Sequence, residues 1–84
     1  MAELTSLNNI GKEMERKLKS VDISTAEELR SVGSTEAFVK LRLRYSNVCL
    51  VHLYCLEGAI TGIDYNCLPE DVKQRLKAFS DGLK

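Results

Sequence analysis

Hydrophobic residues recur at helical spacing along most of the chain, and none of its segments alternates apolar and polar residues as a strand does. The most apolar segment, residues 47–63, contains one formal charge, Glu57. On a helical wheel most of its polar side chains share one narrow stripe with Leu50 and Tyr54, and apolar side chains fill most of the remaining arc. That arc carries Val48, Val51, Leu53, Leu56, Ala59, Ile60 and Ile63. A helix with so wide an apolar arc must be surrounded by other helices, so residues 47–63 are predicted to form a buried central helix.

Four amphipathic segments are predicted to form the surrounding helices. They are residues 12–20, 25–33, 35–44 and a last helix beginning at Pro69. Their apolar positions fall three or four residues apart, as one face of a helix requires. The residues predicted to be buried are Met14, Leu18, Val21, Ala26, Leu29, Val32, Ala37, Phe38, Leu41, Val72, Leu76 and Phe79.

Local signals predict where these helices begin and end. Ser24 with Glu27 and Thr25 with Glu28 both fit a capping box, and we choose Thr25 as the first cap. Gly33 suits the end of that helix, and Ser34 is expected to cap the next. Pro69 suits a first helical position, and Glu70 and Asp71 suit a helix N-terminus.

Together these elements predict an all-α fold, a compact bundle of about five helices in one domain spanning residues 1–84. Residues 1–8 are long enough for a turn or two of helix, which Leu4 and Leu7 would hold against the core. Residues 81–84 are expected to fray. A membrane span is the competing interpretation of residues 47–63. Spans need roughly 20 mostly apolar residues, and this segment is short and contains His52, Glu57 and two glycines.

Charge and the N-terminus narrow the classes of function. The chain has 12 basic and 12 acidic residues and a formal net charge of zero, which counts against a nonspecific polyanion binder. The first residues contain neither a charged leader nor an apolar signal-peptide core, so we expect a cytoplasmic protein.

The cysteines and the single histidine do not form a recognisable reactive site. Cys49, Cys55 and Cys67 are odd in number and lack C-x-x-C spacing, so we expect free, reduced thiols that fill the core. His52 lies three residues from both Cys49 and Cys55, but the wheel points it into the core, where a backbone carbonyl would be its partner. We therefore predict no catalytic residue, no metal site and no cofactor.

Two further features of the central helix have structural interpretations. Glu57 lies on the polar stripe and has no partner carboxylate, so we expect it to be solvated or ion-paired. Gly58 and Gly62 are spaced as in a close helix–helix contact, and we expect them to permit such packing.

The segment from Leu7 to Leu18, L-N-N-I-G-K-E-M-E-R-K-L, resembles the helix-hairpin-helix pattern. That pattern is a Gly-apolar-Gly turn followed by a cation and a helix, and its backbone N–H groups can donate to a phosphate. Here Asn9 replaces the first glycine, and both Asn9 and Gly11 tolerate a positive φ. The candidate residues for contact with a partner or a phosphate are Asn9, Gly11, Lys12, Arg16 and Lys19. The alternative, which we favour, is that the turn only folds one short helix onto the next.

Five blocks along the chain carry a resemblance to a known family. They are Leu4–Lys12, Thr25–Gly33, Ala37–Arg42, Leu53–Ile63 and Leu68–Lys73. Together they resemble the C-terminal domain of the TfoX/Sxy family of bacterial competence regulators. In larger members of that family this domain follows an N-terminal domain. The resemblance implies a cytoplasmic bacterial protein with a helix-hairpin-helix-like fold, a regulatory role and no enzymatic reaction.

Two functions from different classes remain. The first is a regulatory module that binds a protein partner or a second copy of itself, with no membrane and no small-molecule substrate. The second is weak, sequence-independent DNA-backbone binding through the turn around Gly11. Zero net charge favours the first, and the local cations Lys12, Arg16, Lys17 and Lys19 favour the second. We choose the interaction module.

Overall fold

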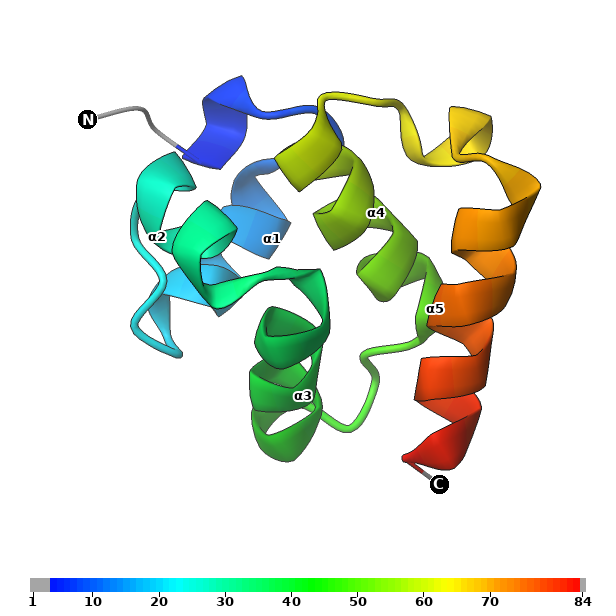
Figure 1. Ribbon diagram of the computed structural model, residues 1–84. Coiled ribbons are helices and arrows are strands. Elements are labelled where there is room, and N and C mark those ends of the chain that lie inside the picture. Colours follow the sequence, from blue (N-terminus) through cyan, green and yellow to red (C-terminus); the bar gives the residue numbers. More distant parts are fainter. Residues whose placement is uncertain (1–3, 84) are drawn as a thin grey trace.

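The computed structural model describes residues 4–83. The secondary-structure elements within these residues are all helices, as predicted. Two short 3-10 helices, η1 and η2, accompany the α-helices α1 to α5 (Figure 1). In chain order the elements are η1 (Leu4–Ser6), α1 (Lys12–Lys19), α2 (Ala26–Val32), α3 (Ser34–Arg44), α4 (Leu50–Thr61), η2 (Tyr65–Cys67) and α5 (Glu70–Gly82). The prediction of an all-α bundle of about five helices is confirmed.

Helix α4 is the central helix, packed against α2, α3 and α5 (Figure 1). Its Leu53 and Leu56 are fully buried among side chains that include Phe38 of α3 and Leu76 of α5. The helix is shorter than the predicted 47–63, and its apolar arc is not wholly covered. Val51 is 49% exposed, because its part of the arc faces a hollow beside α1 and no neighbouring helix covers it.

Two of the three predicted helix starts are corrected by the structure. Thr25 caps α2 as predicted, since its hydroxyl accepts a hydrogen bond from the Glu28 N–H at 3.1 Å. Ser34 is the first residue of α3 and not its cap, because its buried side chain is turned toward α4. Pro69 precedes the first residue of α5 and occupies the cap position.

The predicted helix ends are partly confirmed. Gly33 ends α2 with a φ of 90°, a conformation that suits glycine. Helix α5 continues through Gly82, so Asp81 and Gly82 are helical where fraying was expected, and Lys84 lies outside the described residues. None of the helices in residues 4–83 is long and apolar enough to cross a membrane.

The N-terminal end of the described chain is held against the core by apolar side chains. Leu4 of η1 is fully buried and Leu7 is half-buried against the core, as predicted.

Helix α5 is held to α4 by an ion pair. The Arg75 guanidinium of α5 lies 3.4 Å from the Glu57 carboxylate of α4. The Ser34 hydroxyl donates to the same carboxylate at 2.6 Å. Glu57 is therefore ion-paired, as one of the two predictions had it, and it joins α3, α4 and α5.

Candidate functional site

The loop before α1 contains Asn9 and Gly11, the two residues that tolerate a positive φ, and only one of them adopts it. Asn9 has a φ of 70°. Gly11 has a φ of −92° and does not use this freedom. The reason is that Gly11 caps α1, and a cap residue takes an extended backbone. A Cβ at Gly11 would meet no atom within 4 Å.

The side chain of Asn9 is fully engaged in holding the loop against the end of α4. Its Nδ2 donates to the carbonyls of Ile63 at 3.1 Å and Cys55 at 3.5 Å, and its Oδ1 accepts from the Tyr65 N–H at 3.1 Å. We call these three bonds the Asn9 clamp. Because both ends of the amide are engaged in it, the Asn9 side chain is not presented to a phosphate.

Gly58 is the residue that lets the Asn9 clamp close. A Cβ at this position would lie 2.3 Å from the Ile63 oxygen and 2.4 Å from Nδ2 of Asn9. Gly62 has a different role, since it ends α4 in a left-handed conformation with a φ of 76°. The predicted close helix–helix contact through Gly58 and Gly62 is therefore corrected: Gly58 accommodates a loop and Gly62 forms a turn.

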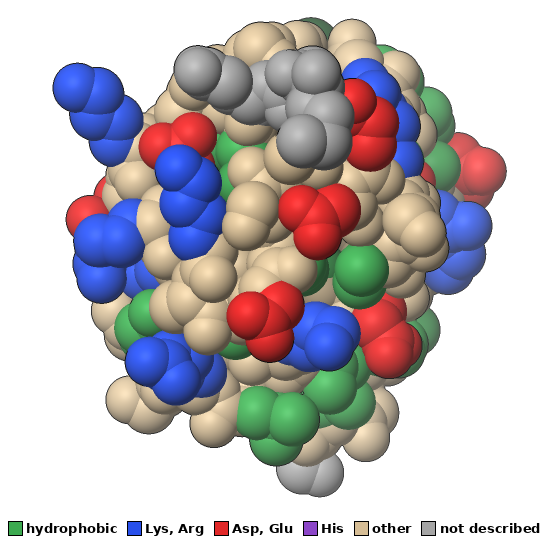
Figure 2. Space-filling view, turned by 90° about the vertical axis from the view of Figure 1, so that its left-hand side faces the viewer, with side chains coloured by type: hydrophobic (Ala, Val, Ile, Leu, Met, Phe, Trp, Pro, Cys, Tyr) green, Lys and Arg blue, Asp and Glu red, His purple; other side chains and the backbone are tan. Residues whose placement is uncertain are grey.

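The candidate cations lie on α1 beside acids of the same helix. Arg16 is ion-paired with Glu13, and the Lys19 ammonium lies 3.9 Å from the Glu15 carboxylate. Lys12 is exposed at the start of the helix. On the face of the molecule beside α2, basic and acidic side chains are interspersed (Figure 2). The structure thus places Lys12, Arg16 and Lys19 on one short helix, with two of the three already next to an acid.

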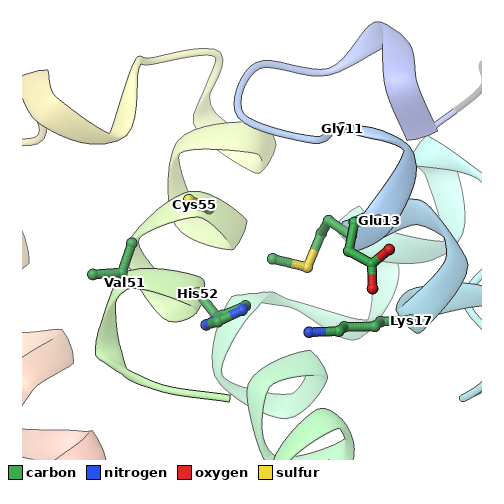
Figure 3. Close-up of a pocket in the computed structure, with 7 residues that line it drawn as sticks. Gly11, Glu13, Lys17, Val51, His52 and Cys55 are labelled. Carbon is green, nitrogen blue, oxygen red and sulfur yellow. The ribbon is translucent and has the colours of Figure 1, made fainter. Parts of the chain in front are cut away.

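A hollow of about 260 Å³ lies between α1 and α4 (Figure 3). Its walls are mostly apolar, and the polar groups that reach it are few. The lining residues are Gly11, Glu13, Met14 and Lys17 from the α1 side and Val51, His52 and Cys55 from α4. Sequence patterns did not indicate this hollow.

Lys17 is the unusual residue of the hollow. It is 8% exposed, although the sequence groups it with Arg16 and Lys19 as a cation available to a phosphate. Its ammonium lies 5.5 Å from the centroid of the Tyr45 ring, a cation–π distance. Within residues 4–83 the ammonium forms no hydrogen bond and no ion pair, although the Lys17 carbonyl accepts a hydrogen bond from the Ser20 hydroxyl at 2.6 Å. Its position three residues after Met14, beside the apolar stripe of α1, was the signal that could have found it.

His52 lies across the hollow from Lys17 (Figure 3). Its Nδ1 accepts a hydrogen bond from the Cys49 N–H at 3.1 Å, so the proton of the neutral ring is on Nε2. Partial burial and the nearby positive charge of Lys17 lower the pKa of His52 below its usual value of 6.5. The prediction of a core histidine bound to a carbonyl is wrong on both counts: the ring is only half-buried, and it accepts a hydrogen bond from a backbone N–H instead of donating one to a carbonyl.

The cysteines are free, but they do not fill the core as predicted. Cys49 and Cys67 are exposed, and Cys55 is half-buried at the hollow. Burial is the main cause that raises the pKa of the Cys55 thiol, which keeps it protonated and weakly nucleophilic. Among residues 4–83 no group of three His, Cys, Asp or Glu side chains could hold a metal ion.

Comparison with known proteins gives a consistent family relationship. The family model described as the TfoX C-terminal domain matches residues 1–80. Protein Sxy of Escherichia coli (strain K12) is 35% identical over 80 residues, which are 95% of this chain and 38% of Sxy. The chain therefore spans well under half the length of that relative.

Two solved structures from Listeria monocytogenes are similar over nearly the whole chain. One, an uncharacterized protein in a triclinic crystal form, is 45% identical with a TM-score of 0.95, covering 98% of this chain and 93% of that one. The other, a protein of unknown function in a tetragonal form, is 44% identical with a TM-score of 0.93, covering 96% and 99%.

Proposed function

The chain belongs to the TfoX C-terminal domain family, and from that premise we propose that it is a non-enzymatic module that binds another protein within a regulatory assembly. The match to Sxy supports a competence-regulator-like domain. The proposal includes a cytoplasmic location and no cofactor. Two features of the described residues support the absence of catalysis: the Nδ1 of His52 is occupied by a backbone N–H, and the raised pKa of Cys55 keeps its thiol protonated.

The observation that carries this proposal is an exposed apolar surface where α3 and α5 end. Leu43 is 84% exposed, and Leu83 is 39% exposed. With Val39 and Arg42 they line a hollow of about 240 Å³, and we call these four residues the Leu43 surface. Hydrophobic side chains are visible at the lower end of the face in Figure 2, the end toward which α3 extends in Figure 1. Adjoining exposed apolar side chains with a polar rim are typical of a protein-binding surface.

Two arginines indicate the chemistry of the partner: Arg42, which belongs to the Leu43 surface, and Arg44, which follows Leu43 in the chain. The Arg42 guanidinium lies 5.8 Å from the centroid of the Phe38 ring, and that of Arg44 lies 5.9 Å from the Tyr45 ring. Stacking on a ring limits the motion of a guanidinium, which lowers the entropy cost of binding a carboxylate. The surface thus fits a partner with an apolar side chain next to acids.

Charge also distinguishes a different protein from a second copy of this chain. A two-fold dimer through the Leu43 surface would place the surface against itself and bring the arginines of both copies together. Like charges across an interface disfavour that arrangement. We therefore propose a different, acidic protein as the partner.

The experiment is capture from a bacterial extract with three forms of the chain, followed by identification of the bound proteins and measurement of each affinity. Leu43→Glu places a negative charge at the centre of the surface. Gln74→Glu adds the same charge on the exposed side of α5 and serves as the matched control. We expect one acidic protein to bind the wild type and Gln74→Glu equally and to lose at least about tenfold in affinity for Leu43→Glu. Equal binding by all three forms, or none by the wild type, would contradict the proposal.

A further inference from the structure

We propose that the hollow between α1 and α4 binds a small organic monocarboxylate, with the carboxylate on Lys17 and the apolar body against Met14, Val51 and Cys55 (Figure 3). The site lies on a different part of the molecule from the Leu43 surface. It therefore goes beyond the protein-binding proposal, and either can fail without the other.

The first argument is the state of Lys17. The stem of Lys17 is mostly buried, but its ammonium stays open to the hollow, because no buried side-chain nitrogen among residues 4–83 lacks a hydrogen-bond partner. Lys17 is 8% exposed, and its ammonium lies 5.5 Å from the centroid of the Tyr45 ring. After the hydrogen bond and charge of Arg16, the charge of Lys17 helps to lower the pKa of Glu13 at the rim of the hollow. Within residues 4–83 the three N–H donors of the ammonium meet no acceptor. A carboxylate in the hollow would give these donors an acceptor and place a negative charge at hydrogen-bond distance from the ammonium.

The second argument is the group that faces Lys17. Figure 3 shows the Lys17 side chain extending from α1 toward His52 of α4. The Nδ1 of His52 is held by the Cys49 N–H at 3.1 Å, which leaves Nε2–H as a donor. An ammonium and an imidazole N–H on opposite sides of one hollow are both donors, so they suit an anion that accepts two hydrogen bonds.

The remaining walls decide what kind of anion fits. Met14, Val51 and Cys55 offer carbon and sulfur to the ligand and no charge, so the anion needs an apolar body. The volume of about 260 Å³ is just below the range of ordinary ligand pockets, roughly 300–1,000 Å³. A short-chain or single-ring acid therefore fits, and a large ligand does not.

Glu13 restricts the charge of the ligand. Its carboxylate is at the rim of the hollow, 70% exposed and ion-paired with Arg16. Arg16 therefore compensates the charge of Glu13, and Lys17 is left to bind the single carboxylate of the ligand. A second negative charge on the ligand would be placed near Glu13 with no cation left to receive it. The hollow is therefore selective for a monocarboxylate over a dicarboxylate or a phosphate.

The test is a titration of the full chain followed by NMR, in which the methyl signals of Met14 and Val51 and the ring signals of His52 report on the hollow. Hexanoate is the probe. Hexan-1-ol has the body without the charge, and acetate has the charge without the body. We expect saturable shifts with hexanoate, confined to α1 and α4, and affinities at least about tenfold weaker for both comparison compounds.

Two variants separate a specific site from general attraction of anions. Lys17→Met keeps the length and the apolar stem of the side chain and removes the ammonium, whereas Lys19→Met removes an exposed ammonium of the same helix. Hexanoate should bind Lys19→Met as it binds the wild type and bind Lys17→Met at least about tenfold more weakly. Unchanged NMR spectra of the free variants establish that both are folded. No saturable shift with hexanoate, or equal affinity for Lys17→Met, would overturn the proposal.

Discussion

At the scale of single residues, Asn9 combines two roles that a glycine in the same turn could not. The backbone needs a φ of 70°, which asparagine tolerates better than most residues with a side chain. The amide then forms the Asn9 clamp with backbone groups of Cys55, Ile63 and Tyr65. In the helix-hairpin-helix pattern glycine occupies this position because the backbone approaches a phosphate there. In this protein the same position is used to fasten the loop to the end of α4.

Two substitutions of Asn9 separate these roles. Asn9→Gly keeps the backbone conformation and removes the clamp, so we expect a loss of about 1–3 kcal/mol in the free energy of unfolding. Asn9→Ala removes the clamp and also strains the backbone, which adds about 1–2 kcal/mol. Denaturant melts measure both. Equal losses would mean that the positive φ costs nothing, and a stable Asn9→Gly would mean that the clamp contributes nothing.

The role of Asn9 could not be predicted from the sequence, because its hydrogen-bond partners lie far from it along the chain. The residues bound by Asn9 are up to 56 positions away, and a turn signal reports only on its neighbours. The same limit applies to Lys17, whose burial depends on α4 and Tyr45. By contrast, the Thr25 cap was predictable, because Thr25 and Glu28 are three residues apart and determine it by themselves.

At the scale of elements, α4 begins without the hydroxyl or carboxylate that usually caps a helix. Cys49 occupies the cap position, and the imidazole of His52 reaches back to accept its N–H. Only a ring with an unprotonated Nδ1 can accept this bond. The start of the central helix therefore depends on the protonation state of one histidine.

This dependence predicts how stability changes with pH. The pKa of His52 is lower in the folded protein than the 6.5 of a free imidazole. Below pH 6.5 the unfolded chain therefore binds more protons than the folded one, so protonation favours unfolding. We expect the free energy of unfolding to be highest above that pH and to fall as the pH drops from about 7 to about 5.5.

His52→Gln provides the control for this pH dependence. Glutamine offers an oxygen acceptor toward the Cys49 N–H and does not titrate. Urea melts at several pH values should show a flatter profile for this variant over the same range. Carboxylates titrate mostly below about pH 5, outside the range compared. An identical slope in wild type and variant would contradict the assignment to His52.

The helical wheel shows how far elements could be predicted. It located the buried side of α4, including Leu53 and Leu56, because spacing along a helix fixes which residues share a face. It also assigned Val51 and His52 to that buried side. The angular position of a residue does not say whether a neighbouring helix covers it. The hollow beside α1 leaves both side chains partly open, and the candidate ligand site lies where coverage is incomplete.

At the scale of the whole molecule, the charges balance locally as well as in total. The chain has 12 basic and 12 acidic residues, and the basic and acidic side chains visible on the face shown in Figure 2 are interspersed. On α1 the pairs Arg16–Glu13 and Lys19–Glu15 lie within the helix itself. A field that attracts nucleic acid needs cations gathered on one face without acids between them.

We therefore predict that the chain does not bind duplex DNA through the α1 turn. In a titration of a short DNA duplex near 50 mM salt, we expect no saturable binding by the wild type. If binding did occur, each neutralised phosphate would contribute about 0.9 to the slope of the logarithm of affinity against the logarithm of salt concentration. Lys12→Glu and Arg16→Glu should give the same result. Saturable binding that both substitutions abolish, in variants that remain folded, would reverse this conclusion and restore the hairpin as a phosphate contact.

The Asn9 clamp has a consequence for the order in which the chain folds. It joins positions 54 and 56 residues apart, and closing so long a loop costs more entropy than closing a loop of a few residues. Contacts of this kind form after the local helices. The Tyr65 amide hydrogen, which is donated to Asn9, is thus a reporter of loop docking. Its exchange with deuterated solvent would record each time the N-terminal loop lifts away while α3 and α4 stay closed.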